Sequence, residues 1–284
     1  MALPMQQEWK TLSNQAILLA MNFLIIAVCI AVVFFVAERF HPPQPQPVFR
    51  RGIWADLVYA PLNILLRILV NFILASAIAR AGVHILPGRF FGVVRGEPAW
   101  FQACVLVIVL DFVFYVIHRL KHRWRWWWRL HETHHSSIDL DFLASVRFHP
   151  LEKLIDRFIF LLPIMILGPG DAAIAIWSVT DVFFGMFGHA NLSWKLGPLK
   201  YIFVGPEMHR WHHVKDPLLR ECNYGNNLSV FDWIFGTAFV SNEQPGDFGV
   251  DDKEYPVTNI LAQFVYAFRS PPRSDAERGE SSDG

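Results

Sequence analysis

Histidine is the residue type in this chain that is best suited to chemistry. Ten of its 12 copies fall between His118 and His213, and eight of those ten recur at helical spacings of three or four residues. The three clusters are His118 and His122; His131, His134 and His135; and His209, His212 and His213. Residues three and four apart lie on one face of a helix, so we expect each cluster to face one point. Neutral imidazole binds iron, zinc, copper and nickel, and these eight imidazoles are too many for one tetrahedral zinc ion. The clusters therefore predict catalytic histidines that hold two metal ions.

The remaining histidines differ in their settings. His189 ends an apolar segment, where a helix terminus at the membrane interface would be level with the clusters, and we predict it as a ninth metal ligand. His149 precedes Pro150, so it suits either metal ligation or a hydrogen-bonded corner, and both interpretations stay open. His41 and His84 are isolated, and we predict no function for them.

The middle cluster also contains a rival motif. His131-Glu132-Thr133-His134-His135 matches H-E-x-x-H, in which two histidines hold zinc and the glutamate acts as general base for peptide hydrolysis. This alternative predicts a zinc-dependent intramembrane hydrolase or protease. It uses only His131, Glu132 and His135 and leaves the other clustered histidines without a role, so we favour the two-metal interpretation.

Composition indicates a membrane protein. Hydrophobic residues make up 53% of the chain and charged residues 18%, with a mean hydropathy of +0.30. Lys+Arg and Asp+Glu are equal at 25 each, so the chain lacks the basic excess typical of nucleic-acid-binding proteins. The three cysteines form no C-x-x-C motif, which argues against a disulfide scaffold, a cysteine zinc site or thiol redox chemistry.

The apolar segments predict an all-α, polytopic membrane helix bundle with about four transmembrane helices. Residues 16–37, 57–79 and 99–117 each provide about the 20 residues that a spanning helix needs. Residues 158–187 are broken by Gly168-Pro169-Gly170-Asp171 into pieces that are short for a span, which predicts a re-entrant or short-helix hairpin. The histidine clusters would then form a helical cap at one face of this bundle.

One face of the second apolar segment is polar. Asn63, Arg67 and Asn71 recur every fourth residue, so they share a helix face that should point into protein rather than lipid. An arginine inside a membrane usually has a structural partner, and Asp111 in the third segment is the candidate.

The distribution of Lys and Arg predicts the orientation. Segments 38–56 and 118–157, on the histidine side, hold three and eight basic residues, against four on the other side. The positive-inside rule therefore places the histidine cap in the cytoplasm. Trp124, Trp126, Trp127 and Trp128 alternate with arginines, as expected of a helix end at the level of the lipid headgroups. The polar, Ser- and Asp-rich residues 269–284 predict a disordered tail.

The motifs together resemble those of the fatty acid hydroxylase/sterol desaturase superfamily of integral-membrane di-iron oxygenases. Three histidine boxes carry the resemblance: Asp111-x3-Tyr115-x2-His118-Arg119-x2-His122, Leu130-His131-x2-His134-His135-Ser136 and His209-Arg210-Trp211-His212-His213. Four further segments resemble its other motifs: Arg147-x-His149-Pro150-x-Glu152, His189-Ala190-Asn191, Asn223-Tyr224-Gly225 and Phe231-Asp232-x2-Phe235-Gly236-Thr237. The resemblance covers roughly residues 99–239, about half the chain.

This resemblance implies a fold and a reaction. It implies membrane helices with a cytosolic histidine-rich cap, two iron ions, dioxygen as cosubstrate, and attack on an unactivated C–H bond of a lipid such as an acyl chain or sterol. Hydroxylation is favoured over desaturation. Electrons would come from an external NAD(P)H-linked donor, a separate ferredoxin- or cytochrome-type protein, since the sequence contains no haem, flavin or G-x-G-x-x-G segment. A compact chain without a retention signal favours a bacterial inner membrane over the endoplasmic reticulum.

The same interpretation divides the chain and suggests supporting residues. We predict N-terminal transmembrane helices and connectors in residues 1–98, the catalytic domain in 99–240 and a C-terminal cytoplasmic segment in 241–284. With histidine as the metal ligand, carboxylates are expected to orient the imidazoles through their other ring nitrogen. The candidates for this task are Asp111, Asp139, Asp141, Glu207 and Asp232. A non-enzymatic metal carrier is the remaining alternative, and it is disfavoured because the ligands stop at one membrane interface.

Overall fold

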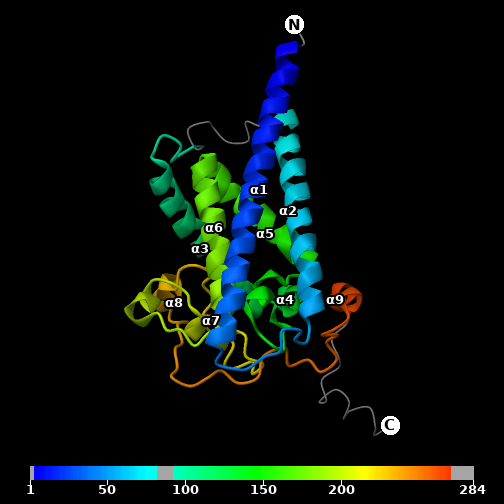
Figure 1. Cartoon of the computed structure of the whole chain (residues 1–284), viewed down its shortest axis with the longest axis vertical. Coiled ribbons are helices and arrows are strands. Elements are labelled where there is room, and N and C mark those ends of the chain that lie inside the picture. Colours follow the sequence, from blue (N-terminus) through cyan, green and yellow to red (C-terminus); the bar gives the residue numbers. More distant parts are fainter. Residues whose placement is uncertain (1–2, 82–91, 270–284) are drawn as a thin grey trace, which may run out of the picture.

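The computed structural model describes residues 3–81 and 92–269. Four of its helices are long and apolar enough to cross a membrane: α1 (Leu3–Phe40), α2 (Ile53–Ala81), α3 (Ala99–Arg123) and α6 (Asp171–His189). At most 39% of the residues in each apolar window are buried, which leaves the rest of each helix surface available to lipid. α6 packs against both α1 and α3, and the helices run along one long axis (Figure 1). The chain is therefore an integral membrane protein.

A helical hairpin completes the bundle. α5 (Pro150–Leu167) and α6 are separated by residues 168–170, so the predicted helical hairpin is present. The expectation that both of its pieces are short for a span is wrong for α6, whose 19 residues are long and apolar enough to cross a membrane. Gly168 ends α5 in the left-handed conformation with φ of 59°, and a Cβ there would lie 2.6 Å from Gly92 Cα. Glycine is required here because only it combines positive φ with such a close approach.

The cap lies at one end of the bundle (Figure 1). α3 leads through Trp124 into the short helix α4 (Arg125–His135), so the first two histidine clusters are joined by an almost continuous helix. Shorter elements complete the cap: η2 (Phe142–Val146), η3 (Gly197–Tyr201), α7 (Pro206–His212), α8 (Val230–Phe235) and α9 (Ile260–Tyr266). Residues 3–81 and 92–269 contain no β-strand, only two isolated bridges. The predicted all-α class is confirmed.

Buried polar contacts hold the cap to the bundle. Near the end of α1, Glu38 accepts hydrogen bonds from the main-chain N–H groups of Phe142 and Asn191, at 2.9 and 2.7 Å. Asn63 of α2 donates to the carbonyl oxygens of Val146 and Phe148, so this part of the polar face points into protein as predicted. In this way α1 and α2 each position cap segments that carry or support a histidine.

Two predictions about the spans are answered in part. Asp111, the candidate partner of Arg67, instead accepts hydrogen bonds from the main-chain N–H groups of Asn227 and Leu228, at 3.0 and 2.6 Å. The side chains of Arg67 and Asn71 lie outside the described residues, as does the tail 270–284. The domain boundaries at residues 98 and 240 remain predictions.

Candidate metal centre

All nine predicted metal ligands lie in two neighbouring groups. The first consists of His118, His122, His131, His135 and His212, and the second of His134, His189, His209 and His213. Within each group, one ring nitrogen from every histidine lies within 4.8 Å of those of the others. His189, which comes from the end of α6, joins the second group and thus stands where the sequence predicted it.

The second and third histidine boxes are split between the groups, so the expectation that each cluster faces one point is wrong for these two. It is right for the first box, since His118 and His122 both belong to the first group. In α4, His131 and His135 face the first group, whereas His134 faces the second. In and after α7 the assignment is reversed, because His209 and His213 belong to the second group and His212 to the first. Residues at i and i+4 share a helix face, and the residue at i+3 is rotated by about 60° from i, which is enough to reach a neighbouring point.

The inward-facing nitrogens lie at distances that suit a shared metal ion. In the first group, His118 Nε2 lies 3.0 Å from Nε2 of both His131 and His212. In the second, His189 Nε2 lies 3.2 Å from that of His134 and 3.3 Å from that of His209. Two nitrogens each about 2.1 Å from one metal, at tetrahedral or octahedral angles, are about 3.0–3.4 Å apart. The donor sets therefore fit two metal ions.

Main-chain carbonyls orient several of the rings. His118 Nδ1 donates to the carbonyl of Tyr224 at 2.8 Å, and His212 Nδ1 to that of Cys222 at 2.7 Å. The Nδ1 atoms of His134 and His189 bond to the carbonyls of Arg147 and Gly185 in the same way, at 3.1 and 2.7 Å. A carbonyl can only accept, so it places the proton on Nδ1 and leaves the Nε2 lone pair for a metal.

Two carboxylates orient two further rings, those of His131 and His122, and they are not the predicted ones. Glu152 Oε1 lies 2.8 Å from His131 Nδ1, and Glu221 Oε1 lies 3.1 Å from His122 Nδ1. Glu152 belonged to a recognised motif, whereas nothing in the sequence singled out Glu221. The five predicted carboxylates bond elsewhere among the described residues: Asp111 and Asp232 to main-chain N–H groups of residues 224–228, Asp139 to Arg51, Asp141 to Arg50, and Glu207 to Leu196 N–H.

The motifs after the third histidine box support the imidazole rings indirectly, through main-chain groups. Asp232 accepts the main-chain N–H groups of Tyr224 and Gly225 at 2.8 and 2.9 Å, and it also accepts the hydroxyl of Thr237. Asn223, with φ of 53°, bonds through its side chain to the main chain of Met208 and Phe239. These contacts fix the Tyr224 carbonyl that receives the His118 proton. Asn223 and the Asp232–Thr237 motif therefore stabilise the loop whose Tyr224 carbonyl orients His118 in the first group.

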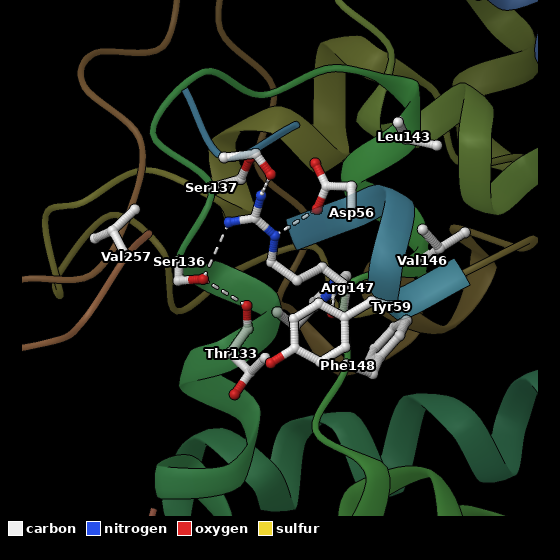
Figure 2. Close-up of polar contacts among 12 residues, drawn as sticks. Asp56, Tyr59, Thr133, Ser136, Ser137, Leu143, Val146, Arg147, Phe148 and Val257 are labelled. Atoms are coloured by element: carbon white, nitrogen blue, oxygen red, sulfur yellow. Dashed lines mark hydrogen bonds and ion pairs between the residues drawn. The ribbon is translucent and has the colours of Figure 1, made fainter. Parts of the chain in front are cut away.

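Arg147 supports the second group from the side of α2. Its carbonyl oxygen accepts a hydrogen bond from His134 Nδ1. Its buried guanidinium donates to Asp56 at 2.5 Å and to the Ser136 hydroxyl at 3.3 Å (Figure 2). Its Nη2 also donates to the Gly52 carbonyl at 2.8 Å, and a Cβ at Gly52, where φ is 81°, would lie 2.7 Å from that Nη2. The α1–α2 connector thus holds the segment between the second histidine box and α5.

His149 forms the hydrogen-bonded corner and belongs to neither histidine group. It caps the start of α5, where its Nδ1 accepts the Leu151 N–H at 3.2 Å, and its Nε2 lies 3.1 Å from the Phe264 carbonyl. Of the two histidines with no predicted function, His41 is exposed and belongs to neither group, and His84 lies outside the described residues.

Burial keeps the cap imidazoles neutral. Desolvation lowers the pKa values of the six histidines of the second and third boxes well below the ordinary 6.5, and neighbouring imidazoles lower these pKa values further. Both ring nitrogens of His135 and the Nδ1 atoms of His209 and His213 are buried without a hydrogen-bond partner. Neutral, unpartnered imidazole nitrogens are the form that binds a cation.

Glu132 does not face the histidine groups. Its carboxylate is buried against Arg129 Nη1 at 3.4 Å, and Arg129 also contacts Asp252. Burial, the largest influence, raises the pKa of Glu132 to about 7. A zinc hydrolase would need this carboxylate beside a water held by His131 and His135, whereas it points to a different side of α4. The geometry disfavours the hydrolase interpretation.

A cavity of about 160 Å³ touches both histidine groups. It lies between α3, α5 and α6, and His118, His134, His189 and His209 form its end at the cap. The cavity therefore provides space for part of a ligand beside the candidate metal centre.

Comparison with known proteins agrees with this geometry. Residues 103–237 match the family described as fatty acid hydroxylase. The chain is 34% identical over 181 residues to the ornithine lipid hydroxylase OlsE of Rhizobium tropici, covering 63% of this chain and 54% of the relative. It is 31% identical over 157 residues to human alkylglycerol monooxygenase, covering 55% and 34% of the two chains.

A plant relative extends the range of lipids. The chain is 29% identical over 147 residues to methylsterol monooxygenase 2-2 of Arabidopsis thaliana, covering 49% of this chain and 54% of the relative. The chain thus spans about half the length, or less, of these relatives. No solved structure matches it. Residues 103–237 therefore carry a fatty acid hydroxylase domain.

Proposed function

We propose that the nine histidines of the two groups hold two iron ions, one in each group. The observation that carries this proposal is the convergence of buried imidazole nitrogens on two neighbouring points, at spacings that suit a shared metal. Imidazole is a good ligand for iron, and the fatty acid hydroxylase domain favours iron over zinc. Glu152, Glu221 and the main-chain carbonyls would keep the proton of each ring that they contact on Nδ1, so that its Nε2 can bind the metal.

The reaction we propose is oxygen-dependent hydroxylation of an unactivated C–H bond in a lipid. Bound iron would supply the redox chemistry that activates dioxygen, which no amino-acid side chain provides. Insertion of one oxygen atom consumes two electrons and two protons, and the second oxygen atom leaves as water. The protein would contribute a buried site that excludes bulk water and a cavity that brings the lipid to both histidine groups. Hydroxylation is favoured over desaturation because the similar proteins are named hydroxylase and monooxygenases.

The substrate is proposed to be a membrane lipid. Three relatives are named for ornithine lipid, alkylglycerol and methylsterol, which share an apolar body and the bilayer as their environment. Four apolar helices place the cavity of this chain next to the same environment. A lipid could therefore reach the histidine groups from the membrane without crossing water.

We also propose the cellular arrangement that the sequence predicted. The basic histidine side would face the cytoplasm, in a bacterial inner membrane, where a separate ferredoxin- or cytochrome-type protein passes on electrons from NAD(P)H. The half-buried Trp128 offers one route from the surface, since its ring centroid lies 4.9 Å from that of His122 and 5.2 Å from that of His135. The Arg220 guanidinium lies over this ring at 4.2 Å, where it is buried and paired with Asp251 at 2.8 Å.

Metal content per chain is the experiment that tests the proposal. Full-length protein should be purified in detergent from iron-supplemented cells, without chelating resin, as wild type and as His212→Ala. We expect close to two irons in wild type and a loss in the variant, together with an oxygen-dependent gain of one oxygen atom in extracted lipid. One zinc ion that is insensitive to His212→Ala, with oxygen-independent hydrolysis abolished by Glu132→Gln, would establish the hydrolase instead.

A further inference from the structure

The cavity beside the histidines is a shaft lined by one stripe from each of three helices. On α6 the stripe is Trp177, Asp181, Gly185 and His189, four residues apart and therefore on one face. These positions extend over about 18 Å of helix at 1.5 Å per residue. His189 ends the shaft at the metal centre, and Trp177 lies at the far end with Leu110 and Phe160.

The middle of this shaft is charged rather than apolar. Lys153, Asp156 and Arg157 of α5 line it, opposite Asp181 of α6. A pocket that accepted only a sterol ring or the middle of an acyl chain would be expected to have an apolar lining. The volume of about 160 Å³ is also below that of a whole-ligand site, so the shaft accommodates part of a lipid. The part that suits charged walls is a polar head group.

The three acidic side chains that line the shaft, Asp111, Asp156 and Asp181, already have protein partners, and Asp111 accepts the main-chain N–H groups of Asn227 and Leu228. Asp156 accepts the Lys121 ammonium at 2.9 Å, and both side chains are buried. Asp181 accepts the side-chain amide of Asn226 at 2.8 Å. Their charge is therefore at least partly satisfied within the protein.

Lys153 is different. Its half-buried ammonium makes no hydrogen bond or ion pair with the part of the chain that the structure describes, and its contact there is the face of Phe148, with Nζ 3.3 Å from the ring centroid. Asp156, Glu152 and Asp181 attract this ammonium from a distance, but none of them pairs with it directly. An ammonium removed from water without a direct ion pair is costly, and a bound anion would offset that cost.

The position of Lys153 links it to the second histidine group. On its other side, the Phe148 ring is stacked on the His134 ring, with centroids 4.2 Å apart and an interplanar angle of 7°. Lys153, Phe148 and His134 thus form a layered arrangement with one aromatic ring between the ammonium and a proposed metal ligand. An anion bound to Lys153 would lie close to the metal centre.

We propose that the shaft binds the anionic group of a lipid, a carboxylate or a phosphate, through an ion pair with Lys153. This inference rests on the proposed lipid-oxidising function and adds an orientation to it. The head-group end of the lipid faces the histidines, and the chain extends past Leu110, Phe160 and Trp177 toward the membrane. The carbon that is oxidised therefore lies near the head group and not near the methyl end of the chain.

Calorimetric binding with matched lipids tests the ion pair without requiring activity. Full-length protein in a neutral maltoside detergent at pH 8 would be titrated with laurate, dodecyl phosphate, methyl laurate and inorganic phosphate. We expect laurate and dodecyl phosphate to bind roughly tenfold to a hundredfold more tightly than methyl laurate, the size of one charge-assisted hydrogen bond. Equal affinity for laurate and methyl laurate would overturn the proposal. Inorganic phosphate that binds as tightly as dodecyl phosphate would identify a free anion as the ligand and overturn the head-group assignment.

Variants at Lys153 assign the effect to this side chain. Lys153→Gln should remove the preference for the anionic lipids and leave methyl laurate binding unchanged, whereas Lys153→Arg should retain the preference. The control is Lys253→Gln, which removes the same charge from an exposed loop and should bind like wild type. A preference that persists in Lys153→Gln would contradict the ion pair. A lowered Tm together with lost methyl laurate binding would make Lys153 a structural residue and also overturn the proposal.

Iron analysis of the same preparations separates the two proposals. Absence of iron and of lipid oxidation would refute the function, while the calorimetric comparison would still test Lys153. On active protein, fragmentation mass spectrometry should locate the added oxygen in the head-group half of the lipid. An added oxygen near the methyl end would refute the orientation even where iron and activity are present.

Discussion

Glu152 Oε1 lies 2.8 Å from Nδ1 of His131 and 2.7 Å from Nζ of Lys121. All three side chains are buried, so this carboxylate joins a ring of the first histidine group to a cation on α3. An ionised carboxylate can only accept, which places the His131 proton on Nδ1 and directs Nε2 to the centre of the group. Glu152 lies in α5, and the hairpin therefore takes part in positioning the metal ligands.

The first prediction concerns this contact. Glu152→Gln should lower the affinity of the first metal position by about tenfold to a hundredfold, because amides orient and polarise imidazole less well than carboxylates. Metal content after dialysis against a graded chelator series measures the change. Glu221→Gln is the matched comparison, since Glu221 contacts His122 from a side chain that is 45% exposed, and its effect should be smaller. Equal retention of metal by wild type and Glu152→Gln would show that the contact is dispensable.

The second prediction follows from the division of the second histidine box. His134→Ala and His135→Ala remove adjacent residues that belong to different groups. Each variant should therefore lose about one of two metals, and from different positions. Metal analysis combined with a spectroscopic probe of the two iron sites distinguishes them. Indistinguishable spectra from the two variants would contradict the assignment of these neighbours to separate groups.

A third prediction concerns stability. Asp56 is fully buried and bonds to the guanidinium groups of both Arg50 and Arg147. Asp56→Asn leaves the buried Arg147 guanidinium without its carboxylate partner, while Arg50 keeps Asp141, so we expect unfolding to become easier by about 3–5 kcal/mol. Thermal unfolding in detergent measures this loss. Asp139→Asn, which breaks the pair with the exposed Arg51, should cost less than about 1 kcal/mol. Similar losses in both variants would argue against a structural role for the buried network.

The fourth prediction is a pH dependence. Burial raises the pKa of the Cys222 thiol from an ordinary 9.0 to about 12. The thiolate is the reactive form, and its fraction rises with pH, so at pH 8 Cys222 should alkylate about a thousandfold more slowly than an ordinary thiol. Iodoacetamide labelling between pH 7 and 10 measures the rate in a Cys29→Ser, Cys104→Ser background. The unfolded protein should react at the ordinary rate. Fast labelling of the folded protein at pH 8 would show that Cys222 is accessible and the loop after α7 open.

Local features of the sequence predicted the helices and the ligand-bearing residues well. Apolar length indicated the spans because a helix must satisfy its main chain within lipid, and the glycines at 168 and 170 marked the hairpin turn. Histidines three and four apart indicated the eight clustered ligand residues, and the structure gathers these eight together with His189. These features depend on contacts within a few residues, which periodicity encodes directly.

Contacts between distant segments were decided only by the tertiary structure. His134 and His135 are neighbours, yet their groups are set by how α4 meets α6 and α7, whose histidines lie more than 50 residues further along the chain. The partnership of Glu152 with His131 and the exposure of Lys153 to the cavity likewise depend on the packing of α5 against α3 and α4. The spacing of residues along one helix determines the directions in which their side chains point around the axis of that helix. The crossing of separate helices, set by side-chain packing along their whole length, specifies which directions meet.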